Sequence, residues 1–403
     1  MKSLLTLVVA AVLAAGAAGA EPLDRDAVLR LARERSPQVL AARARLDEAD
    51  GALATARAWA HNPEVELEQV RRATTDRAWR VDQKLDLAGR GPRIGAARAD
   101  REAAGWERLD AGAQAAAEAA RAWLTATHAG QQRLLATEGV AVQERLHAAA
   151  TAREAAGETG ALDVALATVA LARARAGFAG DRAAELDALA ELAALLQWDE
   201  AELPQVAGDL DWPAPPALAD VREAALVQPA LRALEAATAA AAKRRGEAGA
   251  LAWPELGVFG GGGREEDTDL KQMGLTVTVP LFARGQGERR QAAAAARLAD
   301  DTFTATRRAR LSAVTAAWHR QDELRAAVEA NGEAVAAALD ASVRLAESAY
   351  RLGEITLDEA LLAQREQLEA RRELNDLRLS AALAALDVAY LAALPPLHEG
   401  DGR

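Results

Sequence analysis

The feature that most constrains the fold of this 403-residue chain is an internal repeat. The phrase "AAGETGALDVALAT" at 155–168 returns as "RLGEITLDEALLAQ" at 351–364. Three further matches occur in the same order, at offsets of 191 to 195 residues: Pro37 with Pro229, Pro63 with Pro254, and Trp123 with Trp318. Ordered matches with slowly drifting offsets indicate a duplication. The fold must therefore be one that two similar halves can build together.

Each half predicts the same series of elements: helices interrupted at a proline, then two strands, then a long helical hairpin. In the first repeat, 21–198, we expect strands at about 63–71 and 77–87 and the helical hairpin at 92–198. In the second repeat, 217–394, we expect strands at about 254–263 and 270–282 and the helical hairpin at 287–394. The proline-rich segment 199–216 is expected to link the repeats, and residues 395–403 to form a loose tail.

Both helical hairpins are expected to be unusually long. Only 3% of the residues are aromatic, and alanine dominates the helical stretches, as in extended helices. The runs 92–156 and 287–352 contain no clear break. A run of about 65 residues at ~1.5 Å per residue is close to 100 Å long. Each run ends at a glycine, Gly157 or Gly353, after which a second helix returns.

The strand segments alternate apolar and polar side chains with a period of two. Strands of about 9 to 11 residues have the length of a tilted strand that crosses a lipid bilayer. An ordinary half-exposed hairpin also explains the alternation. On the membrane interpretation, the lipid-facing residues are Val65, Leu67, Trp79, Val81, Leu85, Leu275, Val277, Val279 and Leu281.

Composition and the N-terminal pattern restrict which cell compartment and which classes of partner are possible for this chain. The first 20 residues combine an early lysine, an apolar run and a small-residue ending, which predicts a signal peptide at 1–20. The formal net charge of −12 at pH 7 argues against a nucleic-acid partner. The chain has no cysteine, which excludes disulfides, thiolate metal sites and a lipidated N-terminal cysteine.

The sequence contains no catalytic or cofactor motif that we can identify. Its five histidines lack metal-ligand spacing, and no nucleophile elbow or nucleotide-binding loop occurs. The stretch "AGRGPRIG" at 88–95 lacks the third glycine and the lysine of phosphate-binding loops, so we interpret it as a strand-to-helix corner. We expect a protein that is not an enzyme and that has no cofactor and no metal site.

Several motifs together resemble the outer-membrane efflux protein family typified by TolC. They are "NPEVELE" at 62–68, "QKLDLAGRG" at 83–91, its counterpart "VPLFARGQG" at 279–287, and the duplicated G-E-x-x-x-[LD] phrase. The resemblance covers essentially the whole chain after the signal peptide. It is greatest to the CzcC-like branch, which is associated with heavy-metal efflux.

The resemblance implies a mostly helical fold with a small transmembrane β part. In a TolC-like homotrimer each protomer gives four strands to one 12-stranded β-barrel, and its helices join a long α-helical barrel in the periplasm. The implied protein lies in the outer membrane of a Gram-negative bacterium and is a passive exit duct. Its implied partners are a periplasmic membrane-fusion adaptor and an inner-membrane resistance-nodulation-division pump. The strand pattern agrees, because four strands alone cannot close a barrel and open edges are not tolerated in lipid.

The resemblance also places the turns between the long helices at the periplasmic tip, where they contact the adaptor. These tip-turn residues are Gly157, Glu158, Thr159, Gly353, Glu354 and Thr356. Glycine supplies the positive φ that ends one helix, and the hydroxyl residue can cap the next. The candidate aperture acids are Asp163, Asp358 and Glu359. They either ring the aperture, where carboxylates favour cations, or only stabilise the helix starts.

Two alternatives remain open at this point. A soluble periplasmic coiled-coil scaffold or adaptor explains the long helices but gives the four strands no purpose. A TolC-like duct for drugs or for type I protein secretion has the same fold. With two methionines, no cysteine and scattered histidines, the chain shows no soft-metal lining. Heavy-metal cations as cargo are therefore implied by the branch resemblance alone.

Overall fold

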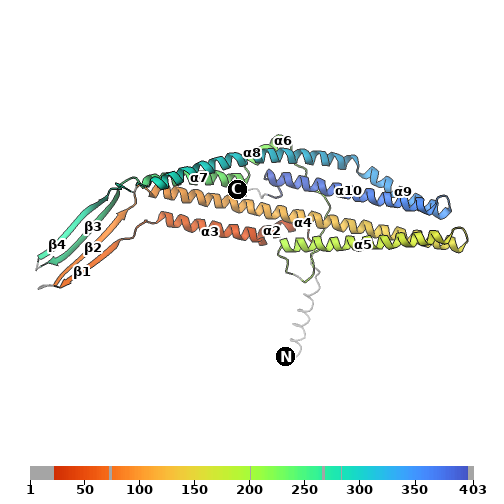
Figure 1. Ribbon diagram of the computed structural model, residues 1–403, viewed down its shortest axis with the longest axis horizontal. Coiled ribbons are helices and arrows are strands. Elements are labelled where there is room, and N and C mark those ends of the chain that lie inside the picture. The colour runs from red at the N-terminus through yellow and green to blue at the C-terminus, as the bar shows by residue number, and fades with distance from the viewer. Residues whose placement is uncertain (1–21, 72–74, 200, 266–267, 283, 398–403) are drawn as a thin grey trace, which may run out of the picture. The chain divides into compact units, whose positions relative to one another are not determined.

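The computed structural model describes residues 22–71, 75–199, 201–265, 268–282 and 284–397 (Figure 1). The expected signal peptide, 1–20, lies outside these ranges. The described part is mostly helical and contains one four-stranded antiparallel sheet, which confirms the fold class. None of its helices has the length and the apolar content needed to cross a membrane.

The elements follow the order that the two repeats predict. The helices are α2 (Arg25–Arg35), α3 (Pro37–Arg57), α4 (Arg90–Ala155), α5 (Ala161–Leu195), α6 (Leu218–Leu226), α7 (Pro229–Ala250), α8 (Gln286–Ala330), α9 (Glu333–Leu352) and α10 (Leu357–Leu391). The strands are β1 (Glu64–Arg71), β2 (Thr75–Leu85), β3 (Glu255–Glu265) and β4 (Thr268–Thr278). Helices α2 and α6 each end just before a proline, since the residue preceding proline disfavours the helical region.

The chain forms two compact units. Among the described residues, the first unit comprises those within 22–37, 112–224 and 313–397, and the second comprises those within 38–111 and 225–312. Each unit takes segments from both sequence halves, because helices of one repeat pack on helices of the other. The whole sheet belongs to the second unit, and the turns that follow α4 and α9 belong to the first.

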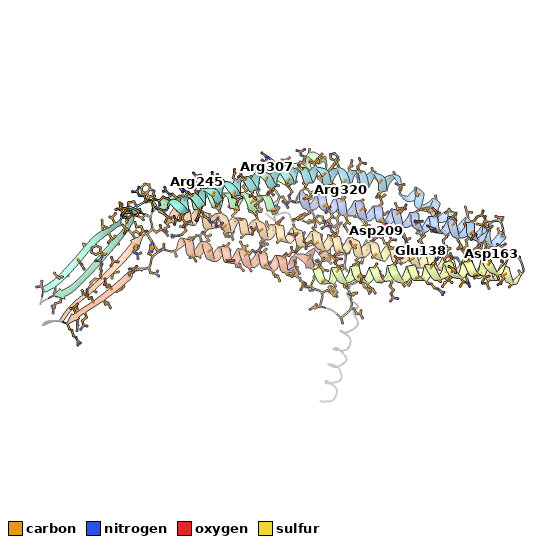
Figure 2. All side chains as sticks on the ribbon, in the orientation of Figure 1. Glu138, Asp163, Asp209, Arg245, Arg307 and Arg320 are labelled. Carbon is orange, nitrogen blue, oxygen red and sulfur yellow. The ribbon has the colours of Figure 1, made fainter. Side chains whose placement is uncertain are left out.

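In the first unit, ion pairs join the helical hairpin α4–α5 to the helical hairpin α9–α10. Arg145 of α4 contacts Glu347 of α9 through two N···O distances of 2.8 and 3.2 Å. Arg371 of α10 contacts Glu138 of α4 at 2.5 Å; Glu138 is labelled in Figure 2. Both ion pairs are partly exposed to solvent, so they add little to stability. We infer that they mainly fix the alignment of one helical hairpin with the other.

The repeated tryptophans tie the surrounding segments to this unit. Trp123 is buried, and its Nε1 donates to the carbonyl oxygen of Leu23 at 3.2 Å. A Cβ at Gly208 would lie 2.6 Å from the Trp123 ring, so only glycine fits there. Trp318 Nε1 donates to the carbonyl oxygen of Pro216 at 3.0 Å. The proline-rich segment therefore packs closely, and Val206 within it forms a β-bridge with Leu23.

The second long helical run is interrupted, which corrects the expectation of one helix over 287–352. Helix α8 ends at Ala330 and α9 begins at Glu333. Asn331 Nδ2 donates to the carbonyl oxygen of Ala327 at 2.8 Å, and Gly332 is the N-cap of α9. Asparagine competes for backbone groups and glycine is a poor helix former, so the pair ends the helix. In contrast, α4 is continuous over 66 residues.

The expectation of a loose tail is wrong for its first residues, 395–397. The Leu397 side chain is buried in the core of the first unit. Arg33 Nη2 donates to the carbonyl oxygens of Pro396 and Leu397 at 2.5 and 2.8 Å. An arginine more than 360 positions away in sequence thus holds this segment, and no local pattern predicts such a contact.

Candidate functional site: a two-faced sheet and two helical tips

The sheet has one apolar face, defined by its strand register. Strand order is β1-β2-β3-β4, and residues directly opposite each other share a face. The pairs Leu67–Trp79, Val65–Val81 and Leu85–Leu256 extend across the sheet in this way. Seven of the nine predicted lipid-facing residues lie on this face: Val65, Leu67, Trp79, Val81, Leu85, Leu275 and Val277. Leu67 is 79% exposed and Leu275 is 77% exposed, so within this chain nothing covers them.

The other two predicted residues, Val279 and Leu281, lie beyond the end of β4 at Thr278. Pro280 follows, and its nitrogen has no hydrogen to donate to a strand ladder, so the strand stops early. Leu256 and Val258 join the apolar face although they were not predicted. The next two positions on the same face are Gly260 and Gly262, which have no side chain, so the period-two pattern of this strand was not visible in the sequence.

Glycines in β3 and β4 leave room for neighbouring aromatic rings to approach the sheet backbone. A Cβ at Gly274 would lie 2.6 Å from the Phe259 ring, and one at Gly262 would lie 3.3 Å from the Trp79 Nε1. On the face that carries Phe259, the Arg80 guanidinium lies 4.1 Å from the Phe259 ring centroid. Arg80 also donates to both carboxylate oxygens of Asp82, at 2.6 and 3.0 Å.

The opposite face of the sheet, here called the charged face, carries an excess of carboxylates. Among its described side chains, five are acidic and two are basic. They are Glu64, Glu66, Glu68, Asp82 and Glu255 against Arg80 and Lys84. The other described positions on this face are glycines, threonines, one glutamine and four apolar residues, namely Val70, Ala78, Phe259 and Leu270. One sheet thus separates an apolar surface from a net negative one.

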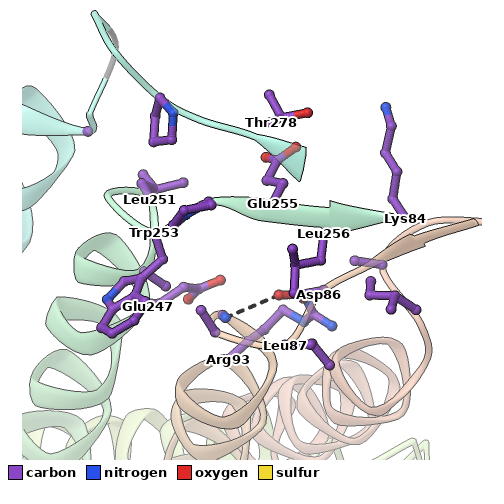
Figure 3. Close-up of a pocket in the computed structure, with 18 of the residues that line it drawn as sticks. Lys84, Asp86, Leu87, Arg93, Glu247, Leu251, Trp253, Glu255, Leu256 and Thr278 are labelled. Atoms are coloured by element: carbon purple, nitrogen blue, oxygen red, sulfur yellow. Dashed lines mark hydrogen bonds and ion pairs between the residues drawn. The ribbon is translucent and has the colours of Figure 1, made fainter. Parts of the chain in front are cut away.

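A pocket of about 610 Å³ lies where the strands meet the helices of the second unit (Figure 3). Asp86 accepts from the Gly89 backbone nitrogen at 3.1 Å and forms an ion pair with Arg93. Helix α4 begins at Arg90, within the stretch that we interpreted as a corner. Trp253 and Leu251 line the opposite side of the pocket. These contacts hold the corner between β2 and α4.

The two repeated turns in the first unit end their helices in the same way. Gly157 has φ +76° and Gly353 has φ +77°, both in the left-handed region. The backbone nitrogens of Glu158 and Glu354 donate to carbonyl oxygens five residues earlier, each at 2.8 Å. This is the hydrogen-bond pattern of a Schellman C-cap, which favours glycine. Both glycines were predicted for this role.

The helices that leave the two turns start differently. Thr356 accepts from the Glu359 backbone nitrogen at 3.3 Å, and Glu359 Oε2 accepts from the Thr356 backbone nitrogen at 2.8 Å, which makes a capping box. These backbone and hydroxyl hydrogen bonds lower the pKa of Glu359. Helix α5 instead has Gly160 as its N-cap, without a side-chain cap. The expectation that Thr159 caps is wrong, since its hydroxyl is buried and has no partner among the described residues.

Arg153 and Tyr350, which no sequence pattern predicted, connect the two turns. Arg153 Nη1 donates to the Tyr350 carbonyl oxygen at 2.9 Å, and its guanidinium lies 5.1 Å from the Tyr350 ring centroid. Arg153 also forms an ion pair with Glu158 at 3.4 Å. Neither residue belongs to the repeated phrase, so only the packing of the helical hairpins identifies them.

Tyr350 is fully buried in a small core to which both turns contribute. Its neighbours there are Leu146, Ala150, Ala167, Leu357 and Ala360. Burial raises the pKa of the Tyr350 phenol, and the nearby carboxylate of Asp163 raises it further, while Arg153 acts in the opposite direction. The position of Asp163 is labelled in Figure 2.

The remaining predicted tip residues point away from this core. The side chains of Glu354 and Asp358 are exposed, and among the described residues they have no hydrogen-bond or ion-pair partner. The described ranges contain no group of three or more histidine or acidic side chains placed to hold a metal ion.

Comparison with known proteins relates this geometry to one family. No family model matches the sequence. The cobalt-zinc-cadmium resistance protein CzcC of Cupriavidus metallidurans is 26% identical over 362 residues, which are 87% of this chain and 85% of that protein.

Solved structures of outer-membrane channels share the fold. CusC superposes with a TM-score of 0.77 at 17% identity, over 92% of each chain. VceC of Vibrio cholerae gives 0.75 at 18% identity, over 91% of this chain and 95% of that one. The CmeC channel of Campylobacter jejuni gives 0.75 at 14% identity, over 91% and 85%. The chain is thus similar in sequence to CzcC, and it has the fold of TolC-like outer-membrane channels.

Proposed function

We propose that three copies of this chain form a passive exit duct for heavy-metal cations in the outer membrane. The duct works with a periplasmic membrane-fusion adaptor and an inner-membrane resistance-nodulation-division pump, which supplies the energy. The observation that carries the proposal is the sheet, with an exposed apolar face, a charged face and two unpaired edge strands, β1 and β4.

These unpaired edges require other chains. In lipid, every backbone donor and acceptor must be paired, so an open four-stranded sheet is not stable there. Three copies close a cylinder of twelve strands when β4 of each copy pairs with β1 of the next. The apolar face then contacts lipid, and the charged face lines the lumen.

The assembly is tested on the full-length protein extracted from membranes. We expect a trimer by mass in detergent, and ion channels when this trimer is added to planar bilayers. A water-soluble monomer that forms no channels would overturn the proposal and favour a periplasmic scaffold or adaptor instead.

The charged face supports a cation as cargo, because carboxylates in a pore favour cations. Replacing Glu66 by glutamine should reduce the cation preference measured from reversal potentials in a salt gradient. Asp269→Asn is the matched control, since it also removes one carboxylate per chain but lies on the apolar face near its end. An equal effect of both variants would mean that the charged face does not line the lumen.

The name of the relative CzcC supports cobalt, zinc and cadmium as cargo. A deletion strain should lose tolerance to these ions and regain it with the wild-type gene. If the deletion strain loses only its tolerance to organic drugs, or fails only to secrete a polypeptide, the cargo is that drug or polypeptide and not a metal cation. The proposal of an exit duct would then still hold.

The two turns form the adaptor-contacting tips of the duct, and Asp163, Asp358 and Glu359 are its candidate aperture acids. The carboxylate of Asp163 lies close enough to buried Tyr350 to raise the pKa of its phenol, which supports a role in holding the tips closed. Asp163→Ala and Glu359→Ala should each raise single-channel conductance. Because Glu359 also caps α10, Thr356→Val is the control that weakens the cap and leaves the acid. Conductance and adaptor affinity that stay unchanged in both alanine variants would leave these acids with a capping role only.

A further inference from the structure

A cluster of cations lies at one end of the apolar face. It consists of Arg71, Arg77, Arg264 and Lys271, here called the basic cluster, with one residue from each strand. In the register, Arg77 is directly opposite Arg264, and Trp79 of the same face is opposite Gly262, which is opposite Lys271. The basic cluster therefore continues the apolar rows beyond Trp79.

Most of this positive charge has no ion-pair partner among the described residues. Arg264 forms an ion pair with Asp269 at 3.1 Å. Among the described residues, Arg71, Arg77 and Lys271 have no ion-pair or hydrogen-bond partner, and all three side chains are exposed. Like charges directly opposite each other on neighbouring strands repel, and Asp269 pairs with Arg264 but not with Arg77, so a further anion beside Arg77 is favourable.

The position of the basic cluster indicates which anion it meets. From Leu85 to Trp79 the apolar face extends over six residue-to-residue steps of β2, which is about 20 Å at ~3.3 Å per step. Arginine on the lipid-facing side of a barrel is costly at the midplane of the bilayer and is tolerated near its surfaces, where aromatic residues collect. Trp79 followed by the basic cluster fits the passage from hydrocarbon to headgroups.

We propose that the basic cluster binds the phosphate groups of lipid A, the phosphorylated glycolipid of the outer leaflet. This inference rests on the proposed function, which places the apolar face in the outer membrane with the helices on the periplasmic side. Guanidinium groups bind phosphate through paired, charge-assisted hydrogen bonds, and neighbouring arginines with a lysine suit a headgroup that carries two phosphates. The duct is anchored at a defined depth as a result.

The test compares two variants that lose the same charge. Arg77→Gln/Arg264→Gln/Lys271→Gln removes three cations of the basic cluster. Arg245→Gln/Arg297→Gln/Arg307→Gln removes three exposed arginines of α7 and α8; Arg245 and Arg307 are labelled in Figure 2. Full-length protein is purified in detergent, stripped of lipid and titrated with bisphosphorylated lipid A, dephosphorylated lipid A and inorganic phosphate, and binding is measured by native mass spectrometry.

We expect the first variant to bind bisphosphorylated lipid A at least about tenfold more weakly than wild type, and the second variant to bind it normally. Dephosphorylated lipid A should bind wild type as weakly as bisphosphorylated lipid A binds the first variant, and inorganic phosphate at equal concentration should not compete. Equal affinity of wild type and first variant would overturn the inference, as would equal binding of both lipids or full competition by inorganic phosphate.

Channel formation by the same preparations separates this inference from the proposed function. If wild type forms channels but the first variant binds lipid A as tightly as wild type, only the proposed lipid site is wrong. If wild-type protein forms no channels, the duct itself is wrong. Circular dichroism and trimer mass of the first variant establish that it is folded before its affinity is compared.

Discussion

The two turns of the first unit come from one repeated phrase, yet they are stabilised in different ways. Both end a long helix at a left-handed glycine, Gly157 or Gly353. The second turn then starts its returning helix with a complete capping box, whereas the first starts α5 at Gly160 without a side-chain cap. The first turn depends more on contacts that Arg153 makes with Glu158 and with Tyr350 beside the second turn.

This difference shows which parts of a duplicated turn can change. The left-handed position favours glycine, because a Cβ there approaches the carbonyl oxygen. A helix start, in contrast, can be satisfied by several side chains, by water or by tertiary contacts. The first turn therefore retains its glycine without keeping the cap.

The substitution with the largest expected effect removes Tyr350, whose side chain packs in the core to which both turns contribute. Tyr350→Ala should destabilise the local core by about 3–5 kcal/mol, because it leaves a cavity beneath the two turns. Hydrogen exchange should accelerate at amides of both turns, 146–160 and 350–360. Tyr350→Phe is the control that keeps the ring. Faster exchange at the second turn alone would mean that the turns are independent.

Replacing Gly157 and Gly353 tests the feature that the two turns have in common, the left-handed C-cap. Gly157→Ala and Gly353→Ala should each cost about 1–2 kcal/mol, because both force a Cβ into the left-handed region. Local hydrogen exchange reports the loss. Gly180→Ala within α5, where a Cβ meets nothing within 4 Å, should instead stabilise that helix by about 0.5–1 kcal/mol. A neutral result at Gly157 or Gly353 would contradict the left-handed caps.

Replacing Thr159 and Thr356 tests the feature in which the two turns differ, the side-chain cap at the start of the returning helix. Thr356→Val removes the hydroxyl acceptor of the capping box and should cost about 1 kcal/mol. Thr159→Val removes a buried hydroxyl without a described partner, and it should be neutral or slightly stabilising. Equal losses in exchange protection at the two helix starts would show that Thr159 also caps.

The smallest expected effect is a pH dependence confined to the second turn. Hydrogen bonds from Thr356 lower the pKa of Glu359 below its ordinary value of 4.5 in the folded state. The stabilisation is complete above that ordinary value and is lost as pH falls through the lowered pKa. Exchange at 356–360, corrected for intrinsic rates, should rise there in wild type but not in Glu359→Gln. A similar rise at 160–164 would contradict an assignment to Glu359.

Much of the fold follows from local patterns. The duplication, the turns at Gly157 and Gly353, the continuous α4 and the alternation of β1 and β2 were all readable from residue order, because short-range periodicity and backbone preference determine them. Seven of the nine predicted lipid-facing residues share one face of the sheet for the same reason. The break at Asn331 also had a local signal, which the surrounding helical pattern outweighed.

Other features depended on tertiary structure. Residue order alone did not reveal that Arg153 reaches Tyr350, that Arg33 holds the segment at Leu397, or that Arg77 lies opposite Arg264. Each contact joins positions far apart in the chain, so it arises only after helices pack and strands choose their register. The sequence by itself determined the elements and the turns between them, because those depend on neighbours within a few residues. Tertiary structure alone decided which charged and buried groups meet, because packing sets those distances.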